Sequence, residues 1–452
     1  MSAPWIFGPV VLALVCAAVV GLPLFQDGSS YLFELLVAGS AVRHHRMSAL
    51  LVQLPARVVA DLLAAAPIDA GHRLRWVRGV FTLSYAMVPL SALAVSWLVV
   101  RRRNPAMIVW PALIILFVNL VNFSWVSELW IAIQLCCPLL LASIVAPGTR
   151  GERLLAIALL PFVLLFHPLI ALVLLVMAAG LALVASRDPE RRRAGRVSAV
   201  LYLAAAVVRV LVSPFVLDPH ETAFLETGQM TEYLFAARWP TVLLLASAVV
   251  IGIVCWRGRA VRRVRRPYLG CMVLAPSAAA VLLSYYALGA KGVPLKTGLA
   301  VFAAALLMLL AALDGVAPPP EPERAQRMRL TAVLASVFAV VVVGKSLMWL
   351  TSVRRLSHVL TASGRPCVER DAGELAWVRV PPYVIIDNWA LPSLVLVMRD
   401  HHPGAVLLEA GDCRRLEDTD MVRVDPWSVL PTRLLTPLFG PVTASPGSAR
   451  TS

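Results

Sequence analysis

The chain has 452 residues, of which 59% are hydrophobic and 15% are charged, and its mean hydropathy is +0.79. Because soluble domains carry about 25% charged residues, this composition excludes an ordinary soluble globular protein. The net charge of +15 does not indicate nucleic-acid binding, since the arginines occur in short clusters between apolar runs, as topology signals do.

Apolar runs of about 20 residues, the length of a membrane helix, recur along the chain. This pattern predicts an all-α polytopic membrane protein, whereas a β-barrel would show short alternating segments. The first run has no basic N-terminal region and no clear cleavage site, so we expect a retained helix rather than a signal peptide. We predict eleven transmembrane helices, at residues 4–24, 80–100, 105–123, 129–146, 154–166, 169–185, 197–217, 239–256, 268–289, 298–314 and 330–350.

The basic residues between these helices predict their orientation. Nineteen Lys and Arg residues lie in the loops on one side, including the stretch 315–329, and three lie in the short loops on the other side. The positive-inside rule then places the N-terminus in the cytoplasm and the C-terminus outside. Residues 25–79, residues 218–238 and the tail after Leu350 are therefore expected to be extracytoplasmic.

The first outer loop contains two stretches with helical periodicity. Residues 48–66 carry apolar and polar side chains on opposite sides of a helix, which is typical of a helix that lies in the membrane interface. Residues 29–39 predict a second, shorter interfacial helix that ends at Gly39. The alternative is that both helices only cover the outer surface of the bundle. The apolar side of 48–66 holds Leu50, Leu51, Leu54, Val58, Leu62 and Ala65, and the polar side holds Gln53, Arg57 and Asp61.

The tail changes in composition. Residues 1–350 form the predicted transmembrane domain, residues 351–440 alternate β-rich runs with turn residues and predict a small α/β lobe, and residues 441–452 are expected to be disordered. Cys367 and Cys413 lie in this lobe, and the other five cysteines lie in predicted helices. Because the extracytoplasmic compartment is oxidising, we favour a disulfide between them over two buried thiols.

Ionisable groups are costly at membrane depth, so those near the helix ends are candidates for function. The inner ends hold mostly arginines and Asp314, whereas varied polar residues gather at the outer ends. No metal-ligand spacing, P-loop or Ser-His-Asp pattern is apparent. The outer residues are Asp27, Arg43, His44, Arg46, Asn119, Asn122, Glu128, His167, Arg209, Asp218, His220, Glu221, Lys291, Lys296 and Lys345.

Each candidate also has a structural interpretation. Asp27 is a suitable N-cap for a helix that begins at Ser29 or Ser30, and the basic residues 43–46 are suited to anionic lipid headgroups.

The remaining candidates divide in the same way. Glu128 is able to form a structural ion pair with a neighbouring arginine. His167 precedes a proline and is suited to a packing role. The side chains of Lys291 and Lys296 are able to extend to the membrane interface. Arg209 is the most costly residue to place in a membrane helix, so it needs Asp218, Glu221 or a bound phosphate as partner.

The stretch QDGSSY (26–31), directly after the first predicted helix, opens a long outer loop with an early aspartate. Together with the interfacial helices, about ten membrane helices and the C-terminal lobe, this organisation resembles the GT-C superfamily of integral-membrane glycosyltransferases. The resemblance implies that Asp27 is the catalytic base or acceptor-binding carboxylate and that the donor is a polyprenyl-phosphate sugar. The chain departs from the superfamily in having no adjacent acidic pair after the first helix and no tryptophan-rich motif in the tail.

The sequence therefore predicts a multi-pass glycosyltransferase of the bacterial cell membrane, acting on an extracytoplasmic glycan, lipid or protein. Asp27 would take the acceptor proton, and Arg209, Lys291, Lys296, Arg43 and Arg46 would stabilise the leaving phosphate. Whether a divalent cation takes part is left open. The alternatives are a transporter or flippase of lipid-linked precursors and a non-catalytic membrane assembly protein.

Overall fold

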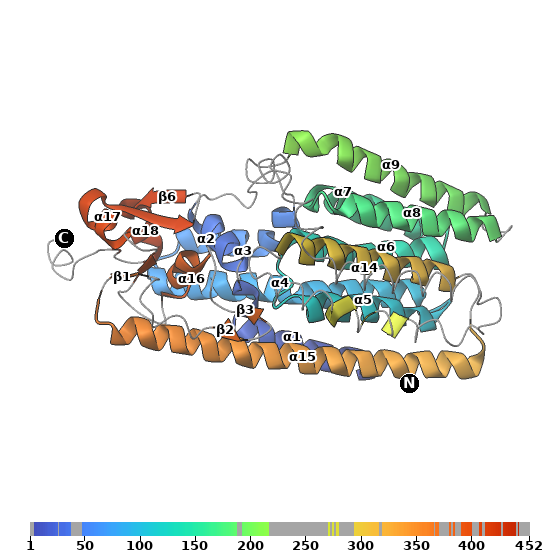
Figure 1. The fold of residues 1–452 in the computed structure, drawn as a ribbon, viewed down its shortest axis with the longest axis horizontal. Helices are drawn as coiled ribbons and strands as arrows, with labels where there is room; N and C mark the ends of the chain where they lie inside the picture. Colours follow the sequence, from blue (N-terminus) through green and yellow to red (C-terminus); the bar gives the residue numbers. More distant parts are fainter. Residues whose placement is uncertain are drawn as a thin grey trace. The chain divides into compact units, whose positions relative to one another are not determined.

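The structure is a computed structural model, and helices make up most of the chain that it describes (Figure 1). The predicted helices at 239–256 and 268–289 lie wholly or largely outside the described residues. The structure describes residues 4–25, 27–37, 48–187, 192–216, 270–271, 274, 277–279, 293–315, 319–365, 367–369, 379–380, 383–384, 390–399, 406–408, 412–425, 428–439 and 442.

Several described helices are long and apolar enough to cross a membrane, which identifies a helical membrane protein. Five segments meet this criterion within the described residues: Ala70–Val100, Glu128–Val145, Arg192–Ser213, Thr297–Asp314 and Glu321–Ala362. Three shorter apolar segments, Pro4–Val19, Pro105–Val121 and Ile170–Ser186, accompany them.

Two helices are at least ten residues longer than the sequence predicted. Helix α4 spans Ala70–Val100 and α15 spans Glu321–Ala362, so the assignment of 315–329 to a loop was wrong for its second half. The prediction ended each helix where charged residues lower the hydropathy. Arg and Glu are nevertheless good helix formers, so a helix is able to continue through such turns. The start of α4 is fixed by Asp69, whose carboxylate accepts the His72 N–H at 2.9 Å. This hydrogen bond, together with the His72 side chain, lowers the pKa of Asp69.

The chain divides into two compact units, and each is described by itself. Unit 1 comprises Met1–Leu12, His44–Ser48 and Val88–Val341, and unit 2 comprises Ala13–Arg43, Ala49–Met87 and Val342–Ser452. Helices α1 (Pro4–Val19), α4 and α15 run from one unit into the other.

Unit 1 is built around α6 (Glu128–Val145), whose residues are all buried. Its sequence is apolar on every side, as expected for a helix surrounded by other helices. The helices around it run side by side (Figure 1). They are α5 (Val109–Val121, preceded by the 3-10 helix η2, Pro105–Ile108), α7 (Arg150–Phe166), α8 (Ile170–Arg187), α9 (Arg192–Val216) and α14 (Val293–Asp314).

Small residues allow the helices of unit 1 to approach closely, as is usual in membrane bundles. A Cβ atom placed on Gly180 of α8 would lie 2.9 Å from the Ala312 Cβ of α14, and one on Gly195 of α9 would lie 3.0 Å from the Ala185 Cβ of α8. Glycine is thus required at these two contacts by space rather than by backbone conformation.

The outer side of α9 carries large apolar side chains that no described part of the protein covers. Such a surface would be unfavourable in water, and it is suited to contact with lipid. The exposed residues are Val197, Val200, Leu201, Leu203, Val207, Val208, Val210 and Leu211.

Unit 2 contains η1 (Leu22–Leu24), α2 (Asp27–Val37), most of α3 (Ser48–Ala64), the first part of α4 and the last part of α15. The two sides of α3 match the sequence pattern. Gln53 is buried and donates to the Tyr85 hydroxyl at 2.8 Å, while four apolar residues, Leu51, Leu54, Val58 and Leu62, are exposed. The apolar side of α3 is therefore available to lipid.

The remaining part of unit 2, residues 363–442, is called the C-terminal segment. It contains three two-stranded pairings: β1 (Cys367–Glu369) parallel to β4 (Val406–Leu408), β2 (Arg379–Val380) antiparallel to β3 (Tyr383–Val384), and β5 (Met421–Asp425) antiparallel to β6 (Ser428–Pro431). Its helices are α16 (Leu391–Val397), α17 (Asp412–Thr419) and α18 (Thr432–Phe439).

We expect Gly180→Ala to destabilise the protein, because the new methyl group would meet Ala312. Overpacking of this kind costs about 1–3 kcal/mol, which thermal unfolding in detergent measures. Gly298→Ala on α14 is the matched control, since nothing lies within 4 Å of its Cβ position and alanine favours a helix by up to about 1 kcal/mol. Equal melting temperatures for the two variants would contradict the close contact of α8 and α14.

Candidate functional site

Asp27 lies at a tight corner between two helices of unit 2. The chain leaves α1, turns at Gly21 with a φ of 74°, forms η1 and enters α2 at Asp27. Asp27 is half-buried and occupies the first turn of α2, where the positive end of the helix dipole favours a carboxylate. The helix thus begins at Asp27 itself, two residues before Ser29.

The corner packs against α15. The ring of Phe25 meets Trp349 edge-on, with centroids 6.1 Å apart. A Cβ on Gly21 would lie 3.3 Å from Leu24 and 3.8 Å from the Trp349 indole nitrogen. Lys345, 4% exposed, lies one turn before Trp349 on α15. The side of α15 that holds the corner therefore also carries a buried lysine.

Helix α2 has two different sides. Asp27, Tyr31 and Glu34 are half-buried and follow at i, i+4 and i+7, so they share one side. The Ser30 hydroxyl, which lies next to this side of the helix, donates to Glu34 Oε1 at 3.2 Å. Sequence analysis did not single out Tyr31 or Glu34, although the helical spacing from Asp27 would have indicated them.

The other side of α2 is covered by protein. Ser29, Leu32, Phe33 and Leu35 are buried, and α2 packs against α16 and α18 of the C-terminal segment (Figure 1). Protein therefore covers the apolar side of α2, which favours the alternative that this helix covers part of the protein. The amphipathic pattern was correct, but the apolar side meets residues that are distant in the sequence.

In unit 1 the helices alternate in direction, because short connections join α5 through α8. Two hydrogen bonds fix one end of this array. The Trp110 indole at the start of α5 donates to Asp314 at the end of α14 at 3.0 Å, and Arg103 Nη1 donates to the Val145 carbonyl at the end of α6 at 3.0 Å. We call this the basic end, since the arginine clusters 101–103 and 192–196 border it.

Glu128, His167 and Arg209 lie at the opposite end of unit 1. Glu128 begins α6, His167 ends α7, and Arg209 lies in the last two turns of α9. The Tyr202 hydroxyl of α9 donates to the Leu139 carbonyl of α6 at 3.2 Å. This contact brings Tyr202 of α9 and Leu139 of α6 together. Away from the basic end, Arg209 lies about 10 Å beyond Tyr202 along α9, and Glu128 lies about 16 Å beyond Leu139 along α6.

Several polar groups at this end are buried. Glu128 is 5% exposed and Arg209 is 4% exposed. Burial of a charged side chain is costly unless the charge has a partner. Asn119 and Asn122 are also buried, and their amides donate to the carbonyls four residues earlier, at 2.8 and 3.0 Å.

His167 is held by its own chain. It is half-buried, and its Nδ1 accepts the Leu169 N–H at 3.2 Å. This geometry favours the structural interpretation of His167, in which the side chain caps the turn between α7 and α8.

The other candidates fall outside what the structure describes. These are Arg43, His44, Arg46, Asp218, Glu221 and Lys291, together with the side chain of Lys296, whose backbone belongs to α14. Asp27 belongs to unit 2, whereas Glu128, His167 and Arg209 belong to unit 1. Across the described residues, no group of three or more His, Cys, Asp or Glu side chains is suited to hold a metal ion.

A buried charge cluster at the basic end was missed by the sequence analysis. Arg327, 2% exposed, bonds to Asp314 and Glu323, and its Nη2 lies 3.1 Å from Asp314 Oδ1 and 2.6 Å from Glu323 Oε1. Trp110 donates to the same aspartate. The assignment of Arg327 to a cytoplasmic loop was wrong, because the helix extends through it and turns it toward two carboxylates. The i, i+4 spacing of Glu323 and Arg327 was the available signal.

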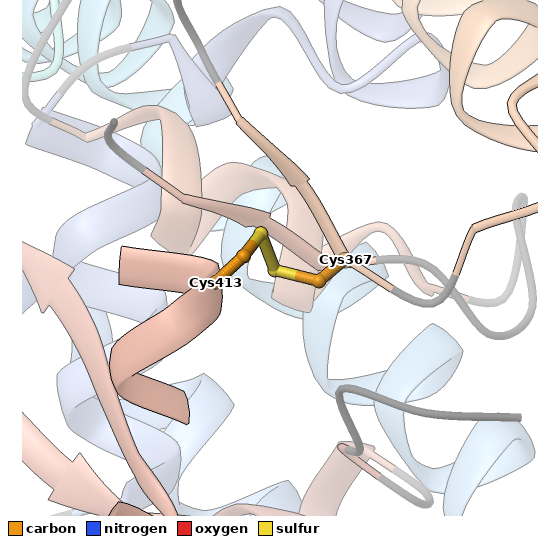
Figure 2. The surroundings of a disulfide bond; sticks show 2 residues. All are labelled: Cys367 and Cys413. Carbon is orange, nitrogen blue, oxygen red and sulfur yellow. A yellow bond between two sulfur atoms is a disulfide. The ribbon is translucent and has the colours of Figure 1, made fainter. Parts of the chain in front are cut away.

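A disulfide joins Cys367 of β1 to Cys413 of α17, the pairing that the sequence favoured (Figure 2). It closes the C-terminal segment around the parallel pair β1–β4. Arg78 of α4 donates to the Val397 carbonyl at the end of α16 at 2.8 Å. Two residues further along the chain, burial lowers the pKa of Arg399 to about 10. The C-terminal segment is thus fastened both internally and to α4.

Comparison of the chain with models of known protein families, with curated proteins and with solved structures gives no match.

We expect Arg327→Gln to destabilise the protein strongly, because it leaves Asp314 and Glu323 buried without their guanidinium. Breaking a buried ion pair in this way costs about 3–5 kcal/mol, measurable as a lower melting temperature and lower yield in detergent. Arg329→Gln is the control, since Arg329 is exposed two residues away. Adding Glu323→Gln to Arg327→Gln should recover part of the loss, and two equally stable single variants would refute the role of the cluster.

Proposed function

We propose that the protein is a membrane glycosyltransferase that moves a sugar from a polyprenyl phosphate to an acceptor. Asp27 is the proposed base that takes the proton of the acceptor hydroxyl. The observation that carries the proposal is the position of Asp27. It is a part-exposed carboxylate in the first turn of a helix that directly follows the first membrane helix. A carboxylate at that place, held on a packed helix, supports attack of an acceptor hydroxyl on a lipid-linked sugar at the membrane surface.

The chemistry requires three contributions. A base takes the proton of the acceptor hydroxyl as it attacks the sugar, and an ionised carboxylate within hydrogen-bond reach is able to do so. The positive charge that develops on the sugar is stabilised by nearby negative charge, as in glycoside hydrolysis. The leaving phosphate needs cations whose attraction grows as the bond breaks.

Asp27 supplies the first two contributions in this proposal. Its position in the first turn of α2 places the carboxylate at the positive end of the helix dipole, which attracts negative charge. Glu34 on the same side of α2 adds a second carboxylate toward the acceptor. An acceptor with several hydroxyl groups would find hydrogen-bond acceptors along this side of the helix.

The cations are proposed in the same way. Lys345 lies on the side of α15 that packs on the Asp27 corner, which supports a place for the donor phosphate near that corner. Arg43, Arg46, Lys291 and Lys296 remain candidates from the sequence. The exposed apolar side of α3 is suited to lie along a prenyl chain.

The site is proposed to face the extracytoplasmic side of the cell membrane. The excess of Lys and Arg in the loops on one side of the predicted helices supports this orientation under the positive-inside rule. Lipid-linked sugar donors and glycan, lipid or protein acceptors are then the proposed partners. The role of a divalent cation is left to experiment, and addition or chelation of Mg²⁺ or Mn²⁺ in the transfer assay measures it.

Asp27→Asn should abolish transfer while leaving the protein folded, because asparagine keeps the shape and loses the base. Loss of a general base lowers the rate by about a hundredfold or more. The measurement is transfer of labelled sugar from a panel of polyprenyl-phosphate sugars by the purified protein in lipid nanodiscs.

Asp61→Asn is the matched control, since Asp61 is an exposed carboxylate of α3 that pairs with Arg57 at the surface. It should transfer at the wild-type rate. An Asp27→Asn protein that is as active as the Asp61→Asn protein would remove Asp27 from the mechanism. Movement of lipid-linked sugar across the vesicle membrane without a covalent product would favour a flippase instead.

A further inference from the structure

Helix α2 is too short to hold its own geometry. It has 11 residues, and isolated helices shorter than about 12–15 residues are marginally stable in water. The direction in which Asp27 points therefore depends on what α2 packs against. Among the described elements distant in the sequence, α2 packs against the C-terminal helices α16 and α18.

Two contacts join α2 to these helices. The ring of Phe33 stacks on Phe439 at the end of α18, with centroids 5.6 Å apart and planes 13° from parallel. The Ser29 hydroxyl donates to the Ala390 carbonyl, directly before α16, at 3.3 Å. Ser29 is 0%, Phe33 2% and Phe439 5% exposed, so both contacts are shielded from solvent.

These contacts fix the rotation of α2 about its axis. Ser29 and Phe33 are one turn apart on the same side of the helix, so α2 is held at two successive turns. Asp27, Tyr31 and Glu34 consequently remain on the half-buried side. If either anchor were lost, rotation or fraying of the first turn would move the Asp27 carboxylate, which is two residues from Ser29.

The C-terminal segment provides a firm base for the two anchors. Helix α16 packs on β4 and β5, and the Ser393 hydroxyl of α16 donates to the Val424 carbonyl of β5 at 3.0 Å. The disulfide fastens β1, the partner of β4, to α17. In α18, Leu435 is fully buried one turn before Phe439.

We propose that Phe33 and Phe439 are positioning residues for the Asp27 carboxylate, and that the C-terminal segment is part of the working site through them. The inference rests on the proposed role of Asp27. The segment supplies no reacting group in this proposal. It holds α2 so that the carboxylate meets the acceptor hydroxyl, and misplacement of a reacting group by about 1 Å lowers a rate by up to about a hundredfold.

The test compares three variants of the full-length protein in nanodiscs. Phe439→Ala removes the stack and leaves a cavity, whereas Phe439→Leu removes the stack and keeps most of the buried volume. Leu434→Ala is the control, since Leu434 lies on the same helix and is 49% exposed. The first readout is hydrogen exchange of the α2 amides, which needs no activity, and the second is kcat and KM for sugar transfer.

In Phe439→Ala we expect the α2 amides to exchange about tenfold faster and kcat to fall about tenfold or more with KM changed less than about twofold, because geometry rather than binding is lost. Phe439→Leu should show the same split with a smaller fall, and Leu434→Ala should match the wild type. Phe439→Leu also keeps the test decisive if Phe439→Ala does not fold.

The outcomes separate the inference from the proposed function. Unchanged exchange of α2 in both Phe439 variants would overturn the positioning role, and so would faster exchange with an unchanged kcat. A fall in kcat that Leu434→Ala shares would also overturn it. If the wild-type protein transfers no sugar while α2 loosens in the Phe439 variants, the packing is upheld and the proposed function fails, and with it the role of Phe439 in catalysis.

Discussion

Hydrocarbon cannot form hydrogen bonds, and this constraint decides which side of each membrane helix faces the protein. It explains why α9 exposes a row of valines and leucines while its Tyr202 and Arg209 are buried. It also explains why Asn119 and Asn122 turn their amides back to their own helix. In α3, Gln53 faces the protein and the leucines face outward for the same reason.

The same constraint sets a limit on what the sequence is able to predict. The helices α5, α6 and α8 were located to within a few residues, because long apolar runs end at polar residues such as Asn122 and Glu128. The charged turns at the start of α4 and at both ends of α15 were taken for loops, since hydropathy cannot distinguish a helix that leaves the membrane from a loop. Local capping by Asp69 decided the first case. The ion pair of Arg327 with Asp314, 13 residues earlier, contributes to the second.

Long-range packing was the part that could not be predicted. The sequence indicated a helix near residue 30 and left open whether it lies in the membrane interface or covers the outer surface of the bundle. In the structure the apolar side of this helix meets Ala390 and Phe439, more than 350 residues later. No local signal in residues 27–37 distinguishes lipid from a distant helix, because both accept apolar side chains. For the candidate site, the sequence was therefore able to indicate Asp27 but not the residues that hold it.

The two ends of unit 1 differ in chemistry, and this difference bears on where a substrate is able to bind. At the basic end, the Thr149 hydroxyl caps α7 by accepting the Glu152 N–H at 3.3 Å. The Glu152 carboxylate accepts from the Ser198 hydroxyl at 2.7 Å, and Arg327 is bonded to two carboxylates. The acidic groups there are engaged in holding helix ends together. Arg327 adds no net positive charge to the topology signal, because two carboxylates offset it. The end with Glu128 and Arg209 has the more varied polar side chains, and that variety favours it over the basic end for recognising a polar substrate.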